Sequence, residues 1–192
     1  MRSKLFLTAT LVFLAVYAPC QELCIDEAEQ ELYELLSSKR KAAGLTKIKL
    51  SASLSEVAAL HVHDLMVNKP FDDKCNPHSW SDEGRWDGCC YTSDHSKPEC
   101  MWNKPTELTD YTGKGYEIVA LQELGTDPSA NISPSKAIEL WMDSRGHRSV
   151  ILNQNGFSSI EWKAVGVAIE GNWASVWFGG EADESAPPET CP

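Results

Sequence analysis

The distribution of cysteines constrains the fold of this 192-residue chain more than any other feature. The even number left when Cys20 is set aside favours three disulfides in an oxidising compartment, with the pairing left open. Zinc is the competing interpretation, but the Cys-x-x-Cys spacing of structural zinc sites is missing. We expect the first and last of these cysteines, near the two ends, to pair. The six disulfide candidates are Cys24, Cys75, Cys89, Cys90, Cys100 and Cys191.

The first 20 residues have the layout of a secretory signal peptide. Arg2 and Lys4 precede an apolar run over residues 5–19, which ends in small residues. The run is marginal for a membrane span, and no other stretch of the sequence is long and apolar enough to be one. We therefore expect a secreted, extracellular protein. Its expected parts are a signal peptide (1–20), one folded domain (25–180) and an acidic, proline-rich tail (181–192).

The charge balance excludes one class of partner. The chain has 28 Asp and Glu against 17 Lys and Arg, a formal net charge of −11. Such a surface repels phosphate backbones and anionic headgroups, so we do not expect a nucleic-acid-binding protein. Solubility outside the cell accounts for the acidity.

Hydrophobic periodicity predicts helices near both ends of the domain. Residues 25–43 carry leucines at helical spacing, and Gly44 stands where a helix C-cap belongs. Ser133 and Pro134 are a favourable start for a later helix, with a hydroxyl cap and a proline in the first turn. We expect Gly146 to end that helix, because glycine enters the left-handed conformation at little cost.

Between these lies a second helix that carries two histidines. Ser53 and Glu56 fit a capping box, and the helix is predicted to run to about Val67. His61 and His63 are two residues apart, so their side chains point to different sides of the helix. We interpret one as partly buried and the other as exposed, rather than as ligands.

The rest of the domain predicts a long irregular segment and a small sheet. Residues 68–115 show little periodicity, and such long loops are usually functional or cross-linked. The apolar run 116–123 reads as a strand or a helix. Segments 163–170 and 172–179 alternate in character around a tight turn at Gly171, which predicts a β-hairpin. The element order favours an α+β fold, in which a small antiparallel sheet is covered by helices.

Other residues of the loops have alternative interpretations. Trp80, Trp86 and Trp102 are expected to be buried against the sheet edge, or alternatively to rim a binding surface. Asn131 begins an Asn-x-Ser sequence and is a candidate glycosylation site, although Pro134 follows immediately and weakens it.

Three residues are candidates for a shared site: His78, Glu117 and His147. Two imidazoles and one carboxylate are a ligand set that suits zinc or another divalent cation with an open position. Their spacing carries no signal by itself. Without further evidence, the stronger interpretation is that each is a surface or capping residue, and His147 could simply cap the helix before it.

Several segments resemble the CAP superfamily, which contains cysteine-rich secretory proteins, venom antigen-5 proteins and plant pathogenesis-related proteins. The segment "ELWMDSRGHRSVIL" is similar to the Trp, Gly-His-Arg and Ile-Leu signature of the bacterial-type branch. "KAVGVAIEGNWASVWFG" resembles the closing hairpin of that branch, and "GYEIVA" resembles a Gly-Glu-Asn segment. "ASLSEVAALHVHDLMVN" with the later "HSWSD" resembles its second helix and the histidine that follows. The resemblance runs from about residue 28 to residue 179.

The resemblance implies a three-layer α-β-α sandwich with a central groove that holds two histidines and two acidic residues. By motif, His147 matches the second histidine and Glu117 the first glutamate, although Ile118 replaces the asparagine of the family. His78 matches the first histidine, and His95 is a rival because the dipeptide His-Ser occurs twice.

The second acidic position of the family has no clear counterpart. It falls near Ser144, so Asp143 or Glu139 is the nearest substitute. Some members of the family bind divalent cations in the groove. By resemblance, the metal ligands here would be His78, Glu117 and His147, with zinc or calcium as the cation. The missing acidic residue argues against tight binding.

Three functions compete at this point. The first is a secreted binding or effector module for a small apolar ligand such as a sterol or lipid, a divalent cation, or a protein partner. The second is a metal-dependent, protease-like hydrolase using His78, Glu117 and His147, although the sequence lacks a His-Glu-x-x-His helix and a Gly-x-Ser-x-Gly elbow. The third is a disulfide-linked interaction domain without a working groove. We place binding above catalysis.

Overall fold

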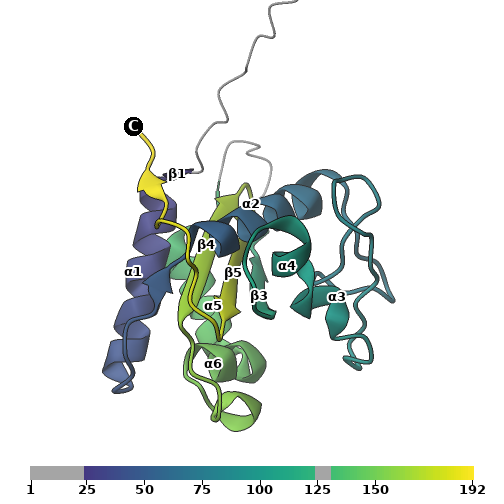
Figure 1. Ribbon diagram of the computed structural model, residues 1–192. Coiled ribbons are helices and arrows are strands. Elements are labelled where there is room, and N and C mark those ends of the chain that lie inside the picture. Colours follow the sequence, from purple (N-terminus) through teal and green to yellow (C-terminus); the bar gives the residue numbers. More distant parts are fainter. Residues whose placement is uncertain (1–23, 124–130) are drawn as a thin grey trace, which may run out of the picture.

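The computed structural model describes residues 24–123 and 131–192. The predicted signal peptide therefore lies outside the described residues. Within those two ranges, no helix has the length and apolar character needed to cross a membrane. The centre of the molecule is a four-stranded sheet in the order β2-β4-β5-β3. Its strands are β2 (Lys49–Leu50), β4 (Ala164–Glu170), β5 (Trp173–Gly179) and β3 (Gly115–Leu121) (Figure 1).

The central strand β5 pairs antiparallel with both of its neighbours, β4 and β3. β4 and β5 form the predicted hairpin, whose turn contains Gly171 at φ +56°. The apolar run at residues 116–123, for which the sequence allowed either a strand or a helix, forms most of the strand β3, which pairs with β5. The short β2 joins β4 in parallel, so the sheet is mixed. β3 is the edge strand at the end opposite β2.

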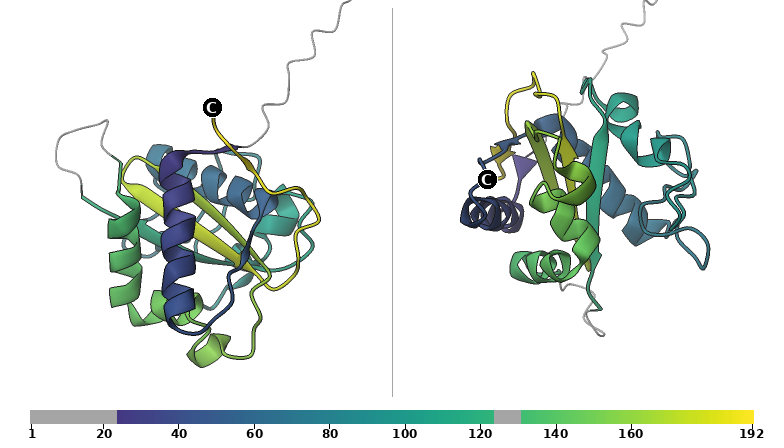
Figure 2. Two further views of the ribbon diagram at one scale, coloured as in Figure 1. Left: turned by 90° about the vertical axis from the view of Figure 1, so that its left-hand side faces the viewer. Right: turned by 90° about the horizontal axis from the view of Figure 1, so that it is seen from below.

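Helices cover both faces of the sheet, and the predicted α-β-α sandwich is confirmed (Figure 2). The long helix α1 and the pair α5 and α6 lie on one face, whereas α2 and the short α3 and α4 lie on the other. The bounds are α1 Glu27–Ala42, α2 Ala52–Val67, α3 Glu99–Trp102, α4 Lys104–Leu108, α5 Pro134–Asp143 and α6 Arg145–Ile151. A 3₁₀ helix, η1 (Asn155–Phe157), follows α6.

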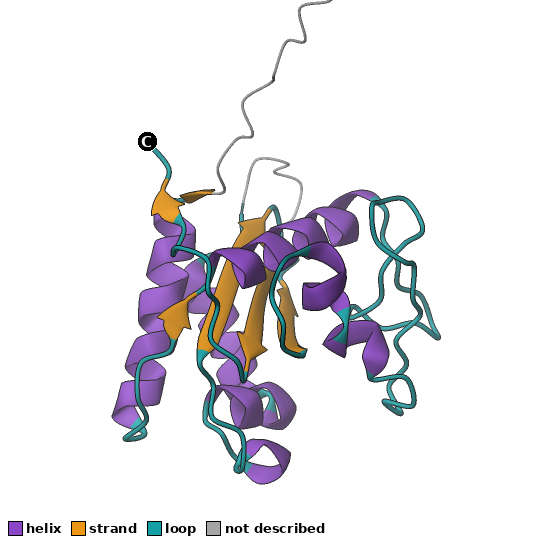
Figure 3. Ribbon diagram, in the orientation of Figure 1, coloured by secondary structure: helices purple, strands orange, loops and turns teal. Residues whose placement is uncertain are grey.

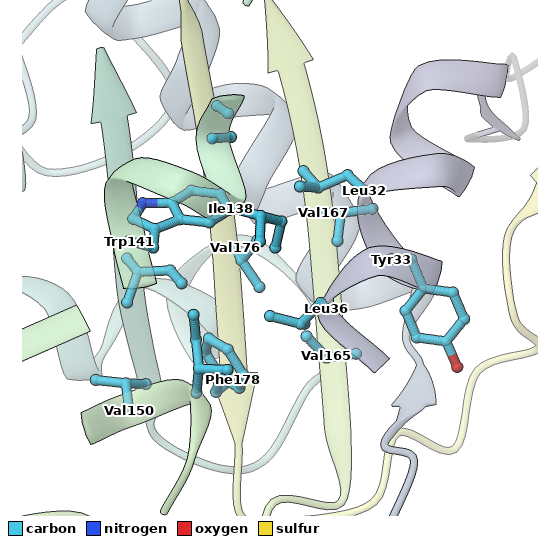
Figure 4. Packing of buried hydrophobic residues seen from close by; sticks show 14 of the residues in the cluster. Leu32, Tyr33, Leu36, Ile138, Trp141, Val150, Val165, Val167, Val176 and Phe178 are labelled. Atoms are coloured by element: carbon cyan, nitrogen blue, oxygen red, sulfur yellow. The ribbon is translucent and has the colours of Figure 1, made fainter. Parts of the chain in front are cut away.

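The alternation of side chains along each strand divides the core into two clusters. One face of the sheet packs against α1, α5 and α6, where Trp141 and Phe178 are fully buried (Figure 4). The opposite face packs against α2, α3 and α4, and Trp177 is its fully buried centre. Here α2 lies so close to β4 that a Cβ at Gly166 would come within 2.0 Å of the Leu54 backbone.

The helix ends follow local capping rules, with one correction. Asp26 and Glu29 form a reciprocal capping box at the start of α1, and Gly44 follows its last turn at φ +76°. The predicted capping box of Ser53 and Glu56 is wrong. The cap of α2 is Ser51, whose Oγ accepts from the Leu54 N–H at 3.0 Å, because the chain turns into the helix directly after β2.

Three disulfides link the six predicted cysteines: Cys24–Cys191, Cys75–Cys90 and Cys89–Cys100. The first is the pair that the sequence predicts. It lies beside a short parallel pairing of β1 (Cys24–Ile25) and β6 (Glu189–Thr190), which holds the C-terminal tail against the start of the domain (Figure 1). Figure 3 shows the long irregular segment between α2 and α3 as a loop. Cys75–Cys90 lies within this segment, and Cys89–Cys100 links it to α3.

Candidate functional site

A cavity of about 680 Å³ lies beside the edge strand β3, where the two helical layers meet. One wall comes from α6, η1 and the chain after them, and the other comes from α3 and the disulfide-linked segment before it. Glu117 and Tyr116 of β3 lie between the two walls. The lining residues are His78, Tyr91, His95, Pro98, Met101, Trp102, Tyr116, Glu117, Ser144, Gly146, His147, Val150, Gly156, Phe157 and Ile160.

Glu117 is the buried anchor of the site, with 4% of its surface exposed. Its register on β3 points the side chain toward α2, the direction that Ser175 takes on the neighbouring β5. Oε1 of Glu117 lies 2.5 Å from His61 Nδ1 and accepts from Ser175 Oγ at 2.6 Å. Oε2 lies 2.7 Å from His78 Nδ1. Three side chains therefore share one buried carboxylate.

His61 is a site residue that the sequence analysis missed. Of the two histidines on α2, His63 is exposed, as interpreted, whereas His61 is fully buried rather than partly buried and contacts the site. Its Nε2 lies 3.0 Å from the carbonyl oxygen of Ser79, and its ring stacks on Trp80 with centroids 4.2 Å apart. The sequence did contain a signal, because His61 is a polar residue on the apolar face of α2. The sequence does not reveal, however, that the Glu117 carboxylate lies opposite this histidine.

The segment that carries His78 is fixed to α2 at a second point, two residues beyond the contact of Ser79 with His61. Asp64, one helical turn after His61, accepts hydrogen bonds from the backbone N–H and the hydroxyl of Ser81. Ser79 Oγ accepts from the Tyr91 N–H at 2.9 Å, which ties this segment to the cross-linked one beyond it. Because buried polar groups need partners, these bonds specify one path for the chain around His78.

His147 enters the cavity from the first turn of α6. The prediction that Gly146 ends a helix is wrong: α5 ends at Asp143, and Ser144 caps a new helix that contains both Gly146 and His147. The Ser144 hydroxyl accepts from the His147 N–H at 3.5 Å. The rings of His147 and His78 face each other edge to face, with centroids 6.4 Å apart. The structure thus brings His78, Glu117 and His147 to one cavity.

Burial and charge shift the pKa values of these groups in different directions. Burial alone would raise the pKa of Glu117, but the charges and hydrogen bonds of His61 and His78 outweigh it and lower that pKa. Burial likewise opposes charge on His61, but Glu117 outweighs it and raises the pKa of His61. Burial lowers the pKa of His147 to about 4; His78 adds to this effect and Glu117 opposes it.

The remaining candidates lie at different places. His95 also lines the cavity, but its Nδ1 pairs with the Tyr91 hydroxyl at 3.1 Å, whereas His78 contacts Glu117. Asp143 and Glu139 are exposed and are not among the lining residues. Asn131, the glycosylation candidate, is exposed.

The three tryptophans of the irregular segment divide between the two interpretations. Trp80 is buried in the core under α2, and Trp86 packs on it with ring centroids 5.1 Å apart. Trp102 lines the cavity and contacts Tyr116, while the ammonium of Lys114 lies 3.9 Å from its ring centroid. Tyr116 in turn packs on Phe157. Aromatic side chains therefore form much of the cavity wall.

In the described structure the contacts of Glu117 compete with a metal ion. Both of its oxygens are engaged by neighbouring side chains, so a cation between the two imidazoles would have to displace one of these contacts to bind the carboxylate. Among the residues that the structure describes, no group of three or more His, Cys, Asp or Glu side chains is placed to hold a metal ion. Binding of zinc or calcium by His78, Glu117 and His147 stays a prediction.

Comparisons with solved structures find the same fold in bacterial proteins. An outer surface protein of Borrelia burgdorferi aligns with 83% of this chain and 96% of its own, at 16% identity and a TM-score of 0.52. An extracellular protein of Bacillus anthracis that contains an SCP domain aligns with 79% of this chain and 40% of its own, at 17% identity and a TM-score of 0.54.

A cysteine-rich secretory protein of Staphylococcus aureus aligns with 85% of this chain and 41% of its own, at 17% identity and a TM-score of 0.50. At these identities the likeness concerns the fold alone. No curated protein has a matching sequence. The family model CAP, described as the cysteine-rich secretory protein family, matches residues 33–175. Because this match spans well over half of the sequence, the chain belongs to the CAP family.

Proposed function

We propose that this protein is an extracellular binding module whose cavity beside β3 holds a small, largely apolar molecule. The observation that carries the proposal is the cavity itself. Its volume of about 680 Å³ falls in the range of small-molecule sites, and apolar and aromatic side chains with a few polar groups line it, as in such sites. The disulfides and the predicted signal peptide support an extracellular setting.

The polar groups of the cavity are few and grouped at one end of β3. His78 and His147 face one another there above the buried Glu117. Since the low pKa of His147 keeps its ring neutral near pH 7, that ring offers one donor and one acceptor rather than a positive charge. We propose that these imidazoles hydrogen-bond a single polar group of the ligand while Tyr116, Phe157 and Trp102 contact its apolar body.

Binding is preferred over hydrolysis for two reasons. In the described part of the chain, no serine or cysteine side chain is hydrogen-bonded to the imidazole of His78 or His147, and all six described cysteines are in disulfides. The carboxylate that a metal-dependent hydrolase would use as a ligand is engaged by His61, Ser175 and His78. Hydrolysis through His78, Glu117 and His147 therefore remains the weaker proposal.

A neutral apolar fluorophore, N-phenyl-1-naphthylamine, tests the proposal. We expect saturable binding at one site per molecule, seen as increased fluorescence. Gly156 lines the cavity, and a Cβ there would meet nothing within 4 Å. Gly156→Phe should therefore fill the cavity from its wall and weaken binding at least about tenfold, or 1.4 kcal/mol. Gly156→Ala is the matched control and should change affinity little.

Two results would contradict the proposal. One is the absence of saturable binding to the folded wild-type protein. The other is equal affinity for wild type and Gly156→Phe, with the fold of both checked by circular dichroism, because the fluorophore would then bind elsewhere.

A further inference from the structure

His61 has an unusual position: both of its ring nitrogens face acceptors inside the core. Nε2 lies 3.0 Å from the Ser79 carbonyl oxygen, which can only accept. Nδ1 lies 2.5 Å from Glu117 Oε1. The ring is fully buried and stacks on Trp80 at an interplanar angle of 13°, so it has no room to turn and no contact with water. These contacts orient His61 to donate from both nitrogens.

The contact with His61 decides which oxygen of Glu117 is left for His78. Oε1 receives both the His61 ring and the Ser175 hydroxyl, at 2.5 and 2.6 Å. Only Oε2 remains, and it lies 2.7 Å from His78 Nδ1. A neutral imidazole that donates from Nδ1 has its lone pair on Nε2. Since His78 lines the cavity, Nε2 is the nitrogen left to meet a ligand.

We propose that His61, which never touches the cavity, is a positioning residue for the binding site: it locks Glu117 so that the carboxylate holds His78 in the tautomer with hydrogen on Nδ1 and a free acceptor on Nε2. The contact of His61 with the Ser79 carbonyl strengthens the arrangement, because Ser79 follows His78 directly in the chain. One buried imidazole thus fixes both the carboxylate partner and the backbone of His78. The ligand-binding part of this proposal rests on the proposed function; the tautomer does not.

The state of the rings can be read directly by NMR. The chain contains five histidines, so selective ¹⁵N labelling of histidine and long-range ¹H–¹⁵N correlation give five ring systems, and His78→Asn and His61→Asn identify two of them. In the wild type we expect the neutral form of His78 to carry its hydrogen on Nδ1, and we expect His61 to carry hydrogen on both nitrogens. Hydrogen on Nε2 of neutral His78, or a single N–H on His61, would overturn the proposal.

A matched pair of variants separates positioning from packing. The amide of Asn reaches about as far as Nδ1 of histidine, whereas the amide of Gln reaches about as far as Nε2. His61→Asn should keep the donor to Glu117 and leave His78 predominantly in the Nδ1–H tautomer. His61→Gln keeps a polar group near the Ser79 carbonyl but loses the donor that holds Glu117, so the fraction of His78 with hydrogen on Nε2 should rise above that in His61→Asn. An identical tautomer in both variants would overturn the proposal.

Binding of N-phenyl-1-naphthylamine in the same samples distinguishes the two proposals. Failure of the wild type to bind the fluorophore would contradict the proposed function but leave the tautomer result standing. Normal binding with the wrong tautomer in the wild type would contradict the positioning role alone.

Discussion

His78 and His147 face each other across one end of the cavity, with ring centroids 6.4 Å apart, although they come from opposite helical layers of the sandwich. Two imidazoles at this separation disfavour a positive charge on both rings at once. Burial is the main cause of the low pKa of His147, and the neighbouring His78 adds to it. The low pKa of His147 makes the stability of the protein sensitive to acid.

Acid should destabilise the protein through His147. An unfolded histidine titrates near 6.5, whereas His147 in the folded state titrates at about 4. Between these values the unfolded chain binds a proton that the folded protein does not, so the free energy of unfolding falls as the pH drops from about 6.5 to about 4. Above this window His147 contributes no pH dependence. Urea unfolding across pH 4–8 should show a smaller loss for His147→Gln than for wild type; equal slopes would contradict the assignment.

Glu117→Gln should be strongly destabilising. The change leaves His61 buried beside a neutral amide and breaks a hydrogen-bonded buried ion pair, for which a loss of about 3–5 kcal/mol is typical. Chemical unfolding measures the difference. Glu139→Gln is the matched control: its pair with Lys136 is exposed, so we expect a change below about 0.5 kcal/mol. A similar small loss for both variants would show that Glu117 is not paired as described.

The disulfide Cys89–Cys100 should support the cavity, whereas Cys24–Cys191 should not. The first cross-links the segment that supplies Tyr91 and Pro98 to the cavity wall. Replacing both of its cysteines with serine should cost about 3 kcal/mol by loop entropy and also weaken binding of N-phenyl-1-naphthylamine. Replacing Cys24 and Cys191 with serine should lower stability by about 5 kcal/mol by the same loop-entropy relation, because this disulfide closes a much longer loop. It should leave the affinity of the folded protein for the fluorophore unchanged. Equal effects on affinity would contradict this division.

The acidic tail should stabilise the start of α2. Asp183 accepts from the Ser51 hydroxyl at 2.5 Å and from the Ser53 N–H at 3.0 Å, at the positive end of the helix dipole. Burial opposes ionisation, but these bonds and one from Ser185 outweigh it and lower the pKa of Asp183. Its contribution is therefore present above the ordinary aspartate pKa and lost as the pH falls below it. Asp183→Asn should cost about 1 kcal/mol at pH 7 in thermal or urea unfolding. Glu184 is the exposed neighbour of Asp183, and Glu184→Gln is the control, which should leave the free energy of unfolding almost unchanged.

Gly146→Ala should stabilise the protein. Gly146 lies in the first turn of α6 with φ outside the left-handed region, and the nearest atom to an added Cβ is 4.0 Å away. Alanine at such a site gains about 0.4–1 kcal/mol. Gly44→Ala is the contrasting variant, because Gly44 has φ +76° and alanine there should destabilise. A loss of stability for Gly146→Ala would restore the interpretation of Gly146 as a helix end.

Local sequence rules predicted much of the fold. Leucine periodicity gave α1, and the alternating segments around Gly171 gave the hairpin of β4 and β5. Where local signals competed, prediction failed: two serines two residues apart both suit a cap for α2, and only the path of β2 selects Ser51. The prediction for Gly146 was wrong for a similar reason. Ser144 caps a new helix, and Gly146 lies within its first turn instead of ending the helix before it.

The sequence by itself determined the helices α1 and α2, the start of α5, the hairpin, the set of six linked cysteines and, through motif resemblance, three residues of the site, because these depend on neighbours in the chain or on short patterns. Only the tertiary structure decided that Glu117 binds His61 and Ser175 as well as His78, and that the carboxylate is thereby engaged. Such a network joins a helix, two strands and a loop, and its geometry arises when α2 packs on the sheet. A buried charge is stable only where tertiary packing places its partners around it, and the spacing of residues along the chain does not show which residues those partners are.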